Sequence, residues 1–166
     1  MNAKTYPMNR KQTGFTLVEL MITLVIAAIL IAVAAPNFSA MTQNNRISAQ
    51  TNQIITAFTF ARSEAVKRSA TINVTATNPI ATDEWGAGWT VSIAGGADLK
   101  IFPPLEGSST LDSNGNISTF QYLPIGRASV TGTFDLCDAR TGEIGRQLTI
   151  LPTGRIALTN SNLNCS

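Results

Sequence analysis

The sequence predicts an α+β fold in which one long N-terminal helix packs on an antiparallel β-sheet. Apolar residues fill positions 15–35 and then recur at helical spacing as far as position 69, which is typical of a single long helix. After position 70, short runs of alternating apolar and polar residues are separated by glycine, proline, asparagine and aspartate. This second pattern is typical of strands joined by turns. A helix followed by several strands is an α+β arrangement.

The first half of the predicted helix has the length and composition of a membrane span. Residues 15–35 read FTLVELMITLVIAAILIAVAA, and Glu19 is their only charge. About 20 apolar residues cross a bilayer as a helix. Lys4, Arg10 and Lys11 precede the run, and no basic residue follows it until Arg46. We therefore expect a cytoplasmic N-terminus and export of the rest of the chain.

Three other interpretations of this segment compete. A secretory signal peptide would use Ala32-Val33-Ala34 as its cleavage site, but its apolar region is usually only about 7–15 residues long. An ordinary signal anchor would gain nothing from Glu19, since a mid-membrane charge costs about 2.5–3.5 kcal/mol. A buried helix of a soluble protein is disfavoured by the length of the run and by the basic flank.

The string Lys11-Gln12-Thr13-Gly14-Phe15-Thr16-Leu17-Val18-Glu19 resembles the N-terminal signal of type IV pilins and type II secretion pseudopilins. The resemblance implies that prepilin peptidase cuts between Gly14 and Phe15 and that the new N-terminal Phe15 is methylated. It also makes Glu19 the fifth residue of the mature chain. Glycine suits such a site because it lets the backbone enter a protease cleft in an extended form.

Cleavage would give Glu19 a role in assembly. Glu19 lies four residues after Phe15, about 6 Å along a helix, and would neutralise the Phe15 amine of a neighbouring subunit in a filament. A buried carboxylate is costly when it is unpaired, and pairing it selects one register between subunits. Pro36 follows the apolar run and removes a helical hydrogen bond, so we expect a bend or a loosened turn there during assembly.

Residues 36–69 are predicted to continue the helix with one apolar face. Ile47, Ile54, Phe58, Ala61 and Ala65 recur at intervals of three, four or seven, and they form a single stripe. Polar residues that can face away from the stripe are Arg46, Gln50, Gln53, Arg62 and Lys67.

Beyond the helix, alternation predicts strands at 71–75, 89–93, 117–122, 129–134, 147–150 and 155–158. Residues 83–88 and 102–107 are expected to be loops. Asn114-Gly115 is typical of a hairpin turn. The string Asp112-Ser113-Asn114-Gly115-Asn116 hints at a calcium loop, but the acidic ligand expected downstream is missing, so a tight turn is favoured and no metal site is predicted.

The resulting domain prediction has four parts. Residues 1–14 are a leader peptide that prepilin peptidase removes, 15–35 a transmembrane and filament-core helix, 36–69 its amphipathic continuation, and 70–166 a periplasmic β-rich domain. The predicted location is the bacterial inner membrane, with a single pass, and then a pilus or pseudopilus.

Composition argues against catalysis. There is no histidine, which removes the usual general base and the Ser-His and Cys-His arrangements, so neither an enzyme nor a cofactor is expected. Cys137 and Cys165 are too few for a structural zinc site without other ligands. In an exported chain they are expected to form a disulfide that closes a loop of about 28 residues and adds about 2–4 kcal/mol. The alternative is two buried thiols.

Further motifs narrow the resemblance to the GspH/FimT/FimU branch of minor pilins and pseudopilins. They cover most of the chain and are Phe60–Arg68, Gly86–Val91, Leu123–Ala128, Leu136–Asp138, Arg146–Ile150 and Thr153–Arg155. The resemblance implies other pilins or pseudopilins, prepilin peptidase and the inner membrane as partners. Three roles stay open: a FimU-like minor pilin that helps to prime or cap a type IV pilus, which the cysteine pair favours, a GspH-like pseudopilin of type II secretion, and a FimT-like minor pilin that binds DNA.

DNA binding is the least favoured of these roles. DNA-binding members carry a Gly-Arg-x-Arg motif, and the matching stretch Gly154-Arg155-Ile156-Ala157 lacks the second arginine. After position 14 the chain has 9 basic residues against 10 acidic ones, so only a local patch would bind phosphates. Its candidate residues are Arg127, Arg140, Arg146 and Arg155.

Overall fold

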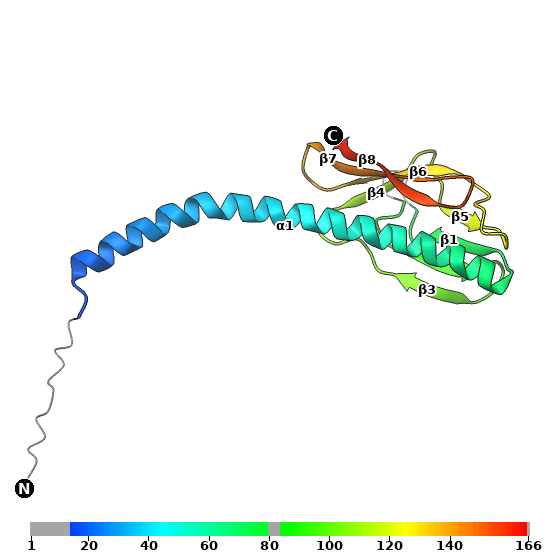
Figure 1. Cartoon of the computed structure of the whole chain (residues 1–166), viewed down its shortest axis with the longest axis horizontal. Coiled ribbons are helices and arrows are strands. Elements are labelled where there is room, and N and C mark those ends of the chain that lie inside the picture. Colours follow the sequence, from blue (N-terminus) through cyan, green and yellow to red (C-terminus); the bar gives the residue numbers. More distant parts are fainter. Residues whose placement is uncertain (1–13, 80–83, 166) are drawn as a thin grey trace, which may run out of the picture. The chain divides into compact units, whose positions relative to one another are not determined.

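The structure, a computed structural model, describes residues 14–79 and 84–165. The chain divides into two units between Met41 and Thr42, and each is described by itself. One helix and eight strands are described (Figure 1): α1 Leu17–Arg68, β1 Ile72–Ala76, β2 Trp89–Ile93, β3 Asp98–Phe102, β4 Thr110–Ser113, β5 Thr119–Tyr122, β6 Gly132–Cys137, β7 Gly142–Ile150 and β8 Ile156–Cys165.

Side-chain and backbone hydrogen bonds define both ends of α1. At its start the Thr16 hydroxyl accepts a hydrogen bond from the backbone N–H of Glu19 at 3.2 Å, as an N-cap residue does. At its end Ser69 adopts a positive φ of 50°. The N–H groups of Ser69 and Ala70 donate to the carbonyls of Val66 and Ala65. This pair of bonds is a Schellman motif, which satisfies the last carbonyls of the helix.

The second half of α1, residues 42–68, supplies one side of the core. The predicted apolar stripe is confirmed, since its five residues are fully buried: Ile47, Ile54, Phe58, Ala61 and Ala65. Two residues expected to face away are covered, Gln50 and, in part, Arg46, whose Nε is buried. Gln50 is only 5% exposed, and its Nε2 donates to the carbonyl of Glu106 at 2.9 Å. A loop after β3 packs over this part of the helix and covers the amide.

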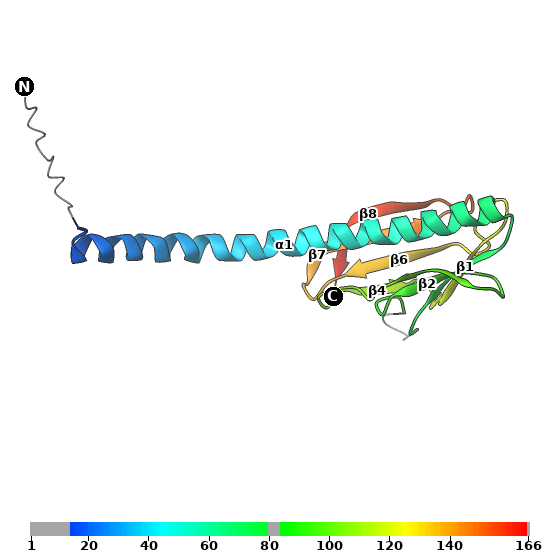
Figure 2. The ribbon, with the colours of Figure 1, turned by 90° about the horizontal axis from the view of Figure 1, so that it is seen from below.

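The strands form two four-stranded sheets, and every pairing in them is antiparallel. The first sheet has the order β3-β2-β1-β5 and the second the order β4-β6-β7-β8. In Figures 1 and 2 the second half of α1 runs alongside strands of both sheets. The predicted α+β class with a long helix and antiparallel strands is therefore confirmed, and the structure adds that the strands divide into two sheets.

Two expectations about the strands need correction. β3 and β4 were not among the predicted strands, and they form outer strands of the two sheets. Asn114-Gly115 forms a turn, with the N–H of Asn116 donating to the carbonyl of Ser113 at 3.1 Å, but it closes no hairpin. It leads from β4, which pairs with β6, to β5, which pairs with β1. The turn therefore carries the chain from one sheet to the other.

Aromatic rings fill the space between α1 and the two sheets. Phe58 of α1 lies with its ring centroid 5.2 Å from that of Phe134 on β6 and 5.8 Å from that of Phe120 on β5. Trp85 lies 5.2 Å from Phe134, and its indole N–H donates to the carbonyl of Ile117. One residue of α1 thus contacts strands from both sheets, which ties residues 42–165 into one core.

Candidate functional site

The backbone around the predicted cleavage position is open. Gly14 precedes the capped first turn of α1, and a Cβ added to it would have no heavy atom within 4 Å. The fold therefore places no demand for glycine at this position, so any demand comes from a partner such as a peptidase. The following residue, Phe15, is 82% exposed. The basic leader residues lie outside the described part of the chain.

Glu19 occupies the first turn of α1. Thr16 and Glu19 stand in the spacing of a capping box, and a carboxylate in the first turn is favoured by the partial positive charge of the helix N-terminus. The sequence prediction assigned Glu19 to assembly alone. Its position adds a local role, because its N–H is the group that the Thr16 hydroxyl caps.

The first half of α1 exposes a large apolar surface. Every described side chain from Phe15 to Met41 is exposed, and the large apolar residues among them include Leu24, Ile29, Leu30, Ile31 and Val33. By length and composition, α1 contains a segment able to cross a membrane. Exposed apolar surface of this extent marks a membrane or protein contact. Pro36 lies inside α1, and its role in assembly stays a prediction.

The predicted disulfide is present between Cys137 and Cys165, whose Cα atoms are 5.8 Å apart. It links the end of β6 to the end of β8, across β7. Gly145 of β7 lies beneath it, and a Cβ there would approach the sulfur of Cys165 to 2.5 Å. A glycine is therefore required at this crossing, a requirement that the sequence prediction missed.

Two of the four candidate arginines are engaged inside the domain. Arg140 forms an ion pair with Asp138 at 2.7 Å and also donates to Asn44 of α1. Burial alone would raise the pKa of Asp138, but hydrogen bonds and charge from Arg140 outweigh it and hold that pKa below its usual range. Arg146 donates to the carbonyls of Ile144 and Ser161. Both guanidinium groups serve the fold.

The other two candidates, Arg127 and Arg155, end two turns of the same kind. The turns read Leu123-Pro124-Ile125-Gly126-Arg127 and Leu151-Pro152-Thr153-Gly154-Arg155. In each, the glycine N–H donates to the leucine carbonyl at 2.8 Å and the leucine N–H donates to the arginine carbonyl at 2.9 Å. The glycines have φ of 76° and 77°. This is a type I turn closed by a glycine bulge, in which the positive φ favours glycine.

The two turns pack directly against each other. A Cβ on Gly154 would lie 2.1 Å from the carbonyl oxygen of Gly126, so only glycine permits this approach. Arg127 Nε lies 3.5 Å from the carbonyl oxygen of Pro152. By contrast, Arg140 precedes β7 and Arg155 follows it. Because a nine-residue strand is about 30 Å long, the four arginines do not form one patch.

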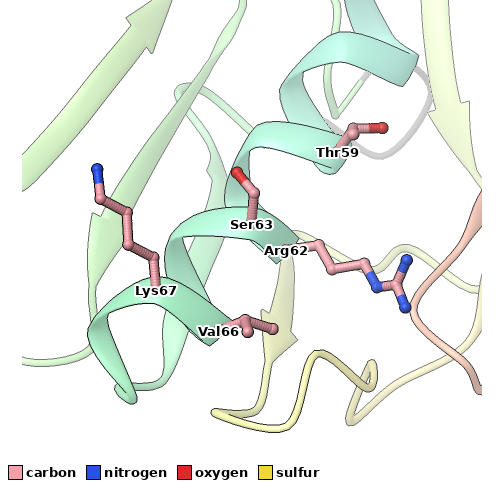
Figure 3. A pocket seen from close by; sticks show the side chains of 5 residues that line it. All are labelled: Thr59, Arg62, Ser63, Val66 and Lys67. Carbon is pink, nitrogen blue, oxygen red and sulfur yellow. The ribbon is translucent and has the colours of Figure 1, made fainter.

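Arg62 of α1 contacts the first of these turns and was not a predicted site residue. Its Nε donates to the carbonyl of Gly126 at 2.9 Å. Figure 3 shows Arg62 and Val66 on the side of the helix that faces the neighbouring turn, with Lys67 pointing away. The sequence signal for this surface is the Leu-Pro-x-Gly-Arg string, which occurs twice, at 123–127 and 151–155.

A pair of acidic side chains lies near the point where the chain changes sheets. Glu84 is 2% exposed, and its Oε2 accepts a hydrogen bond from the N–H of Ser113 at 2.8 Å. Its Oε1 and the Oδ1 of Asp112 are buried without any other partner. Burial, together with the nearby Glu84 carboxyl, raises the pKa of Asp112 to about 6. The Asp112 carboxyl therefore takes up a proton at mildly acidic pH.

Among residues 14–79 and 84–165, no three histidine, cysteine, aspartate or glutamate side chains are arranged to hold a metal ion. The Asp112–Asn116 stretch forms the turn between the sheets and contributes Asp112 to the acidic pair.

Comparison with family models gives two matches. Residues 50–154 match the family of the type II transport protein GspH, and residues 9–35 match the prokaryotic N-terminal methylation motif. The first match covers more than half of the chain, and the second includes the segment from Gly14 to Glu19. No curated protein matches the chain.

Two solved structures are similar in fold. Both are crystal forms of the type IV minor pilin FimU of Pseudomonas aeruginosa (strain PAO1). The first has a TM-score of 0.65 and 23% identity and covers 76% of this chain and 97% of its own. The second has a TM-score of 0.61 and 23% identity and covers 72% and 97%. At this identity the likeness establishes a common fold.

Proposed function

Because this chain belongs to the family of the type II transport protein GspH, we propose that it is a minor pilin that helps to prime or cap a type IV pilus. One observation carries the proposal. A methylation motif at residues 9–35 accompanies a helix whose first half exposes apolar side chains throughout. Such a segment needs a membrane or a filament core to cover it, and the proposed role supplies both and needs no catalysis.

The proposed maturation begins with prepilin peptidase. The enzyme cuts between Gly14 and Phe15, removing residues 1–14, and the α-amine of Phe15 is then methylated. The open surroundings of Gly14 support this step, because no part of the described chain blocks access to the bond. The proposed division then leaves residues 15–35 in the membrane, 36–69 as the rest of the helix, and 70–166 in the periplasm.

Glu19 is proposed to pair with the Phe15 amine of a neighbouring subunit. In the membrane an unpaired carboxylate costs about 2.5–3.5 kcal/mol, and a cationic amine about 6 Å away along the neighbour's helix axis would offset that cost. The exposure of Glu19 supports the proposal, because its carboxylate is available to another chain. Partners are then other minor and major pilins. Pro36 is proposed to let the helix adjust during packing.

The inner membrane with a periplasmic domain is the proposed location. The basic leader favours a cytoplasmic N-terminus, and the Cys137–Cys165 disulfide suits an oxidising compartment outside the cytoplasm.

The main alternative is a minor pseudopilin of type II secretion, which the family's own description favours. The likeness in fold to a type IV minor pilin supports the pilus. DNA binding remains a weaker alternative, since two of its four candidate arginines are engaged within the domain. All three roles use the same processing and the same membrane anchor, so they differ only in the machine that receives the subunit.

Mass spectrometry of the mature chain tests the shared step. We expect a methylated Phe15 at the N-terminus; a start near Pro36 would contradict the whole proposal. Deleting the gene and scoring piliation, protein secretion and DNA uptake separately then distinguishes the roles. Loss of piliation with normal secretion supports the pilus, whereas a defect confined to secretion overturns that choice in favour of the pseudopilin.

A further inference from the structure

The surface around the two Leu-Pro-x-Gly-Arg turns differs from the rest of the domain. We define the twin-turn surface by Arg62, Val66, Ile125, Arg127 and Arg155. All five side chains are exposed, and Ile125 and Val66 are exposed by 70% and 54%. In Figures 1 and 2 the turns after β5 and β7 lie beside the end of α1. Three segments that are distant in sequence therefore contribute to one surface.

The backbone of this surface is fixed. Each turn is closed by two hydrogen bonds, Gly126 and Gly154 approach each other more closely than any side chain would permit, and Arg62 Nε binds the carbonyl of Gly126. A partner would therefore meet a surface that is already ordered. Preorganisation of this kind reduces the entropy lost on binding.

No ion pair among the described residues neutralises the charge of this surface. The ion pairs of the described residues join Glu64 to Lys67 and Arg68, and Asp138 to Arg140. None of them includes Arg62, Arg127 or Arg155. Three guanidinium groups therefore remain available, and a planar guanidinium binds a carboxylate through two parallel hydrogen bonds.

Apolar residues lie among the arginines, and this mixture indicates a polypeptide partner. Ile125 stands between the proline and the glycine of its turn, and Leu123 and Leu151 are more than a third exposed. Interfaces between proteins are enriched in arginine beside apolar side chains, whereas nucleic-acid interfaces are more polar and more strongly positive. The rings that would stack on bases, Trp85 and Trp89, are fully buried.

Among its described residues, a second copy of this chain offers little complementary charge. Of the carboxylates described in residues 42–165, only Asp98 and Glu106 are exposed. They lie at the start of β3 and in the loop after it, and they do not match a surface with three cations. The described side chains therefore favour a complement from a different chain.

We propose that the twin-turn surface docks an acidic segment of a neighbouring filament subunit, with carboxylates on Arg127 and Arg155 and an apolar residue against Ile125. The inference rests on the proposed function, because it requires the chain to enter a filament. It assigns a role to the repeated turns that the processing signal and the membrane helix do not explain.

Site-specific photo-crosslinking tests the proposal. Ile125 is replaced by p-benzoylphenylalanine in the full-length chain, which is produced together with its own filament subunits. We expect a crosslink to a subunit segment that contains at least two aspartates or glutamates. Arg127→Glu and Arg155→Glu together should lower its yield by roughly tenfold or more. Lys100→Glu, which makes half of this charge change on β3, should leave the yield within about twofold, and each single arginine variant, which matches it in charge, should lower the yield by more than that.

Reversing the charge of the crosslinked acidic segment should restore the yield with the double variant, a result that misfolding would not produce. The proposal fails if the yield is unchanged by charge reversal, if the captured segment lacks carboxylates, or if no subunit is captured. Retention of double-stranded DNA by the parent chain, lost in the double variant and without a subunit crosslink, would assign the surface to nucleic acid.

The same samples separate this proposal from the proposed function. The mature N-terminus and the Cys137–Cys165 disulfide are checked by mass spectrometry in every variant. A chain that is not cut at Gly14 contradicts the proposed function. A chain that is cut, methylated and incorporated into filaments, but gives no charge-dependent crosslink at Ile125, contradicts the docking proposal alone.

Discussion

The two halves of α1 contain similar apolar residues, but the first half exposes them and the second half buries them. Ile31 in the first half is 65% exposed, whereas Ile54 in the second half is fully buried. Both halves are helical and rich in apolar side chains. The second half places them in one stripe against two sheets, whereas the first half carries them all around the helix.

The difference teaches how each half is stabilised. A helix that is apolar on every side belongs in a membrane or a large core, and a helix with one apolar stripe belongs on the surface of a sheet. The charged residues follow the same division. Glu84 lies beside Ser113 and Asp112 within its own domain, whereas Glu19 is exposed and, in the proposed function, pairs with another chain.

The largest expected effect is on processing and confined to the first half. Gly14→Leu should reduce the mature form to near zero, because the added side chain would keep the backbone from approaching the peptidase cleft closely. The domain should fold as before, since nothing lies within 4 Å of a Cβ at this position. Immunoblots and mass spectrometry of the membrane fraction measure the ratio of precursor to mature chain.

The control for this variant is the thermal unfolding of residues 42–165, followed by the fluorescence of the buried Trp85 and Trp89. A fall in stability together with the loss of cleavage would show that the first turn of α1 supports the domain, and would contradict the division of the chain into two units.

A matched pair of substitutions in one helix tests the comparison directly. Ile54→Ala should destabilise the domain by about 2–5 kcal/mol, since it leaves a cavity in the core. Ile31→Ala removes the same atoms from an exposed site and should change the unfolding free energy by less than about 0.5 kcal/mol. Both are measured by denaturant unfolding of the full-length chain in detergent. Equal effects would mean that the first half packs on the domain.

Much of this division is readable in the sequence. The 21-residue run is apolar throughout, whereas the apolar residues from Ile47 to Ala65 recur at helical spacing. This spacing predicts which side chains of the second half are buried. The α+β class follows from the same patterns. β3 was missed although Gly95-Gly96 precedes it, a pair that signals a hairpin.

The tertiary partners of polar groups are harder to predict. No local pattern says that Gln50 is covered by the loop at Glu106, that Arg140 is held by Asp138 and Asn44, or that Arg62 meets Gly126. These contacts join segments that are distant in sequence. The hairpin prediction for Asn114-Gly115 was wrong for the same reason, since a turn signal does not specify which strands pair.

The third prediction concerns Asp112 and Glu84, the acidic pair in the domain of residues 42–165. The pKa of Asp112 is about 6 in the folded chain against an ordinary 3.8, so the folded state binds more protons. Stability should therefore be greatest below about pH 4 as far as this group is concerned, and should fall as the pH rises through 6. Between pH 5 and 7.5 we expect a loss of roughly 1–1.5 kcal/mol.

Asp112→Asn should remove this slope, because the amide does not ionise. The carboxylates with lowered pKa, Glu64 and Asp138, contribute stability that is lost as the pH falls through their folded values, so they leave the window above pH 5 undisturbed. Unfolding free energies of both chains across that window measure the effect. Parallel curves would show that Asp112 is ionised throughout this window and would contradict its raised pKa.

The smallest effect is expected where the packed half of α1 ends. Ser69 has a φ of 50°, a conformation that costs a residue with a side chain about 1 kcal/mol and glycine little. Ser69→Gly should therefore stabilise the domain by roughly 0.5–1 kcal/mol. Ser48→Gly, in the interior of the same helix, should destabilise it by about 0.5 kcal/mol. Thermal unfolding compares the two. If Ser69→Gly also destabilises the domain, the positive φ of Ser69 does not limit the stability of the helix end. Packing against β1 would then determine where α1 ends.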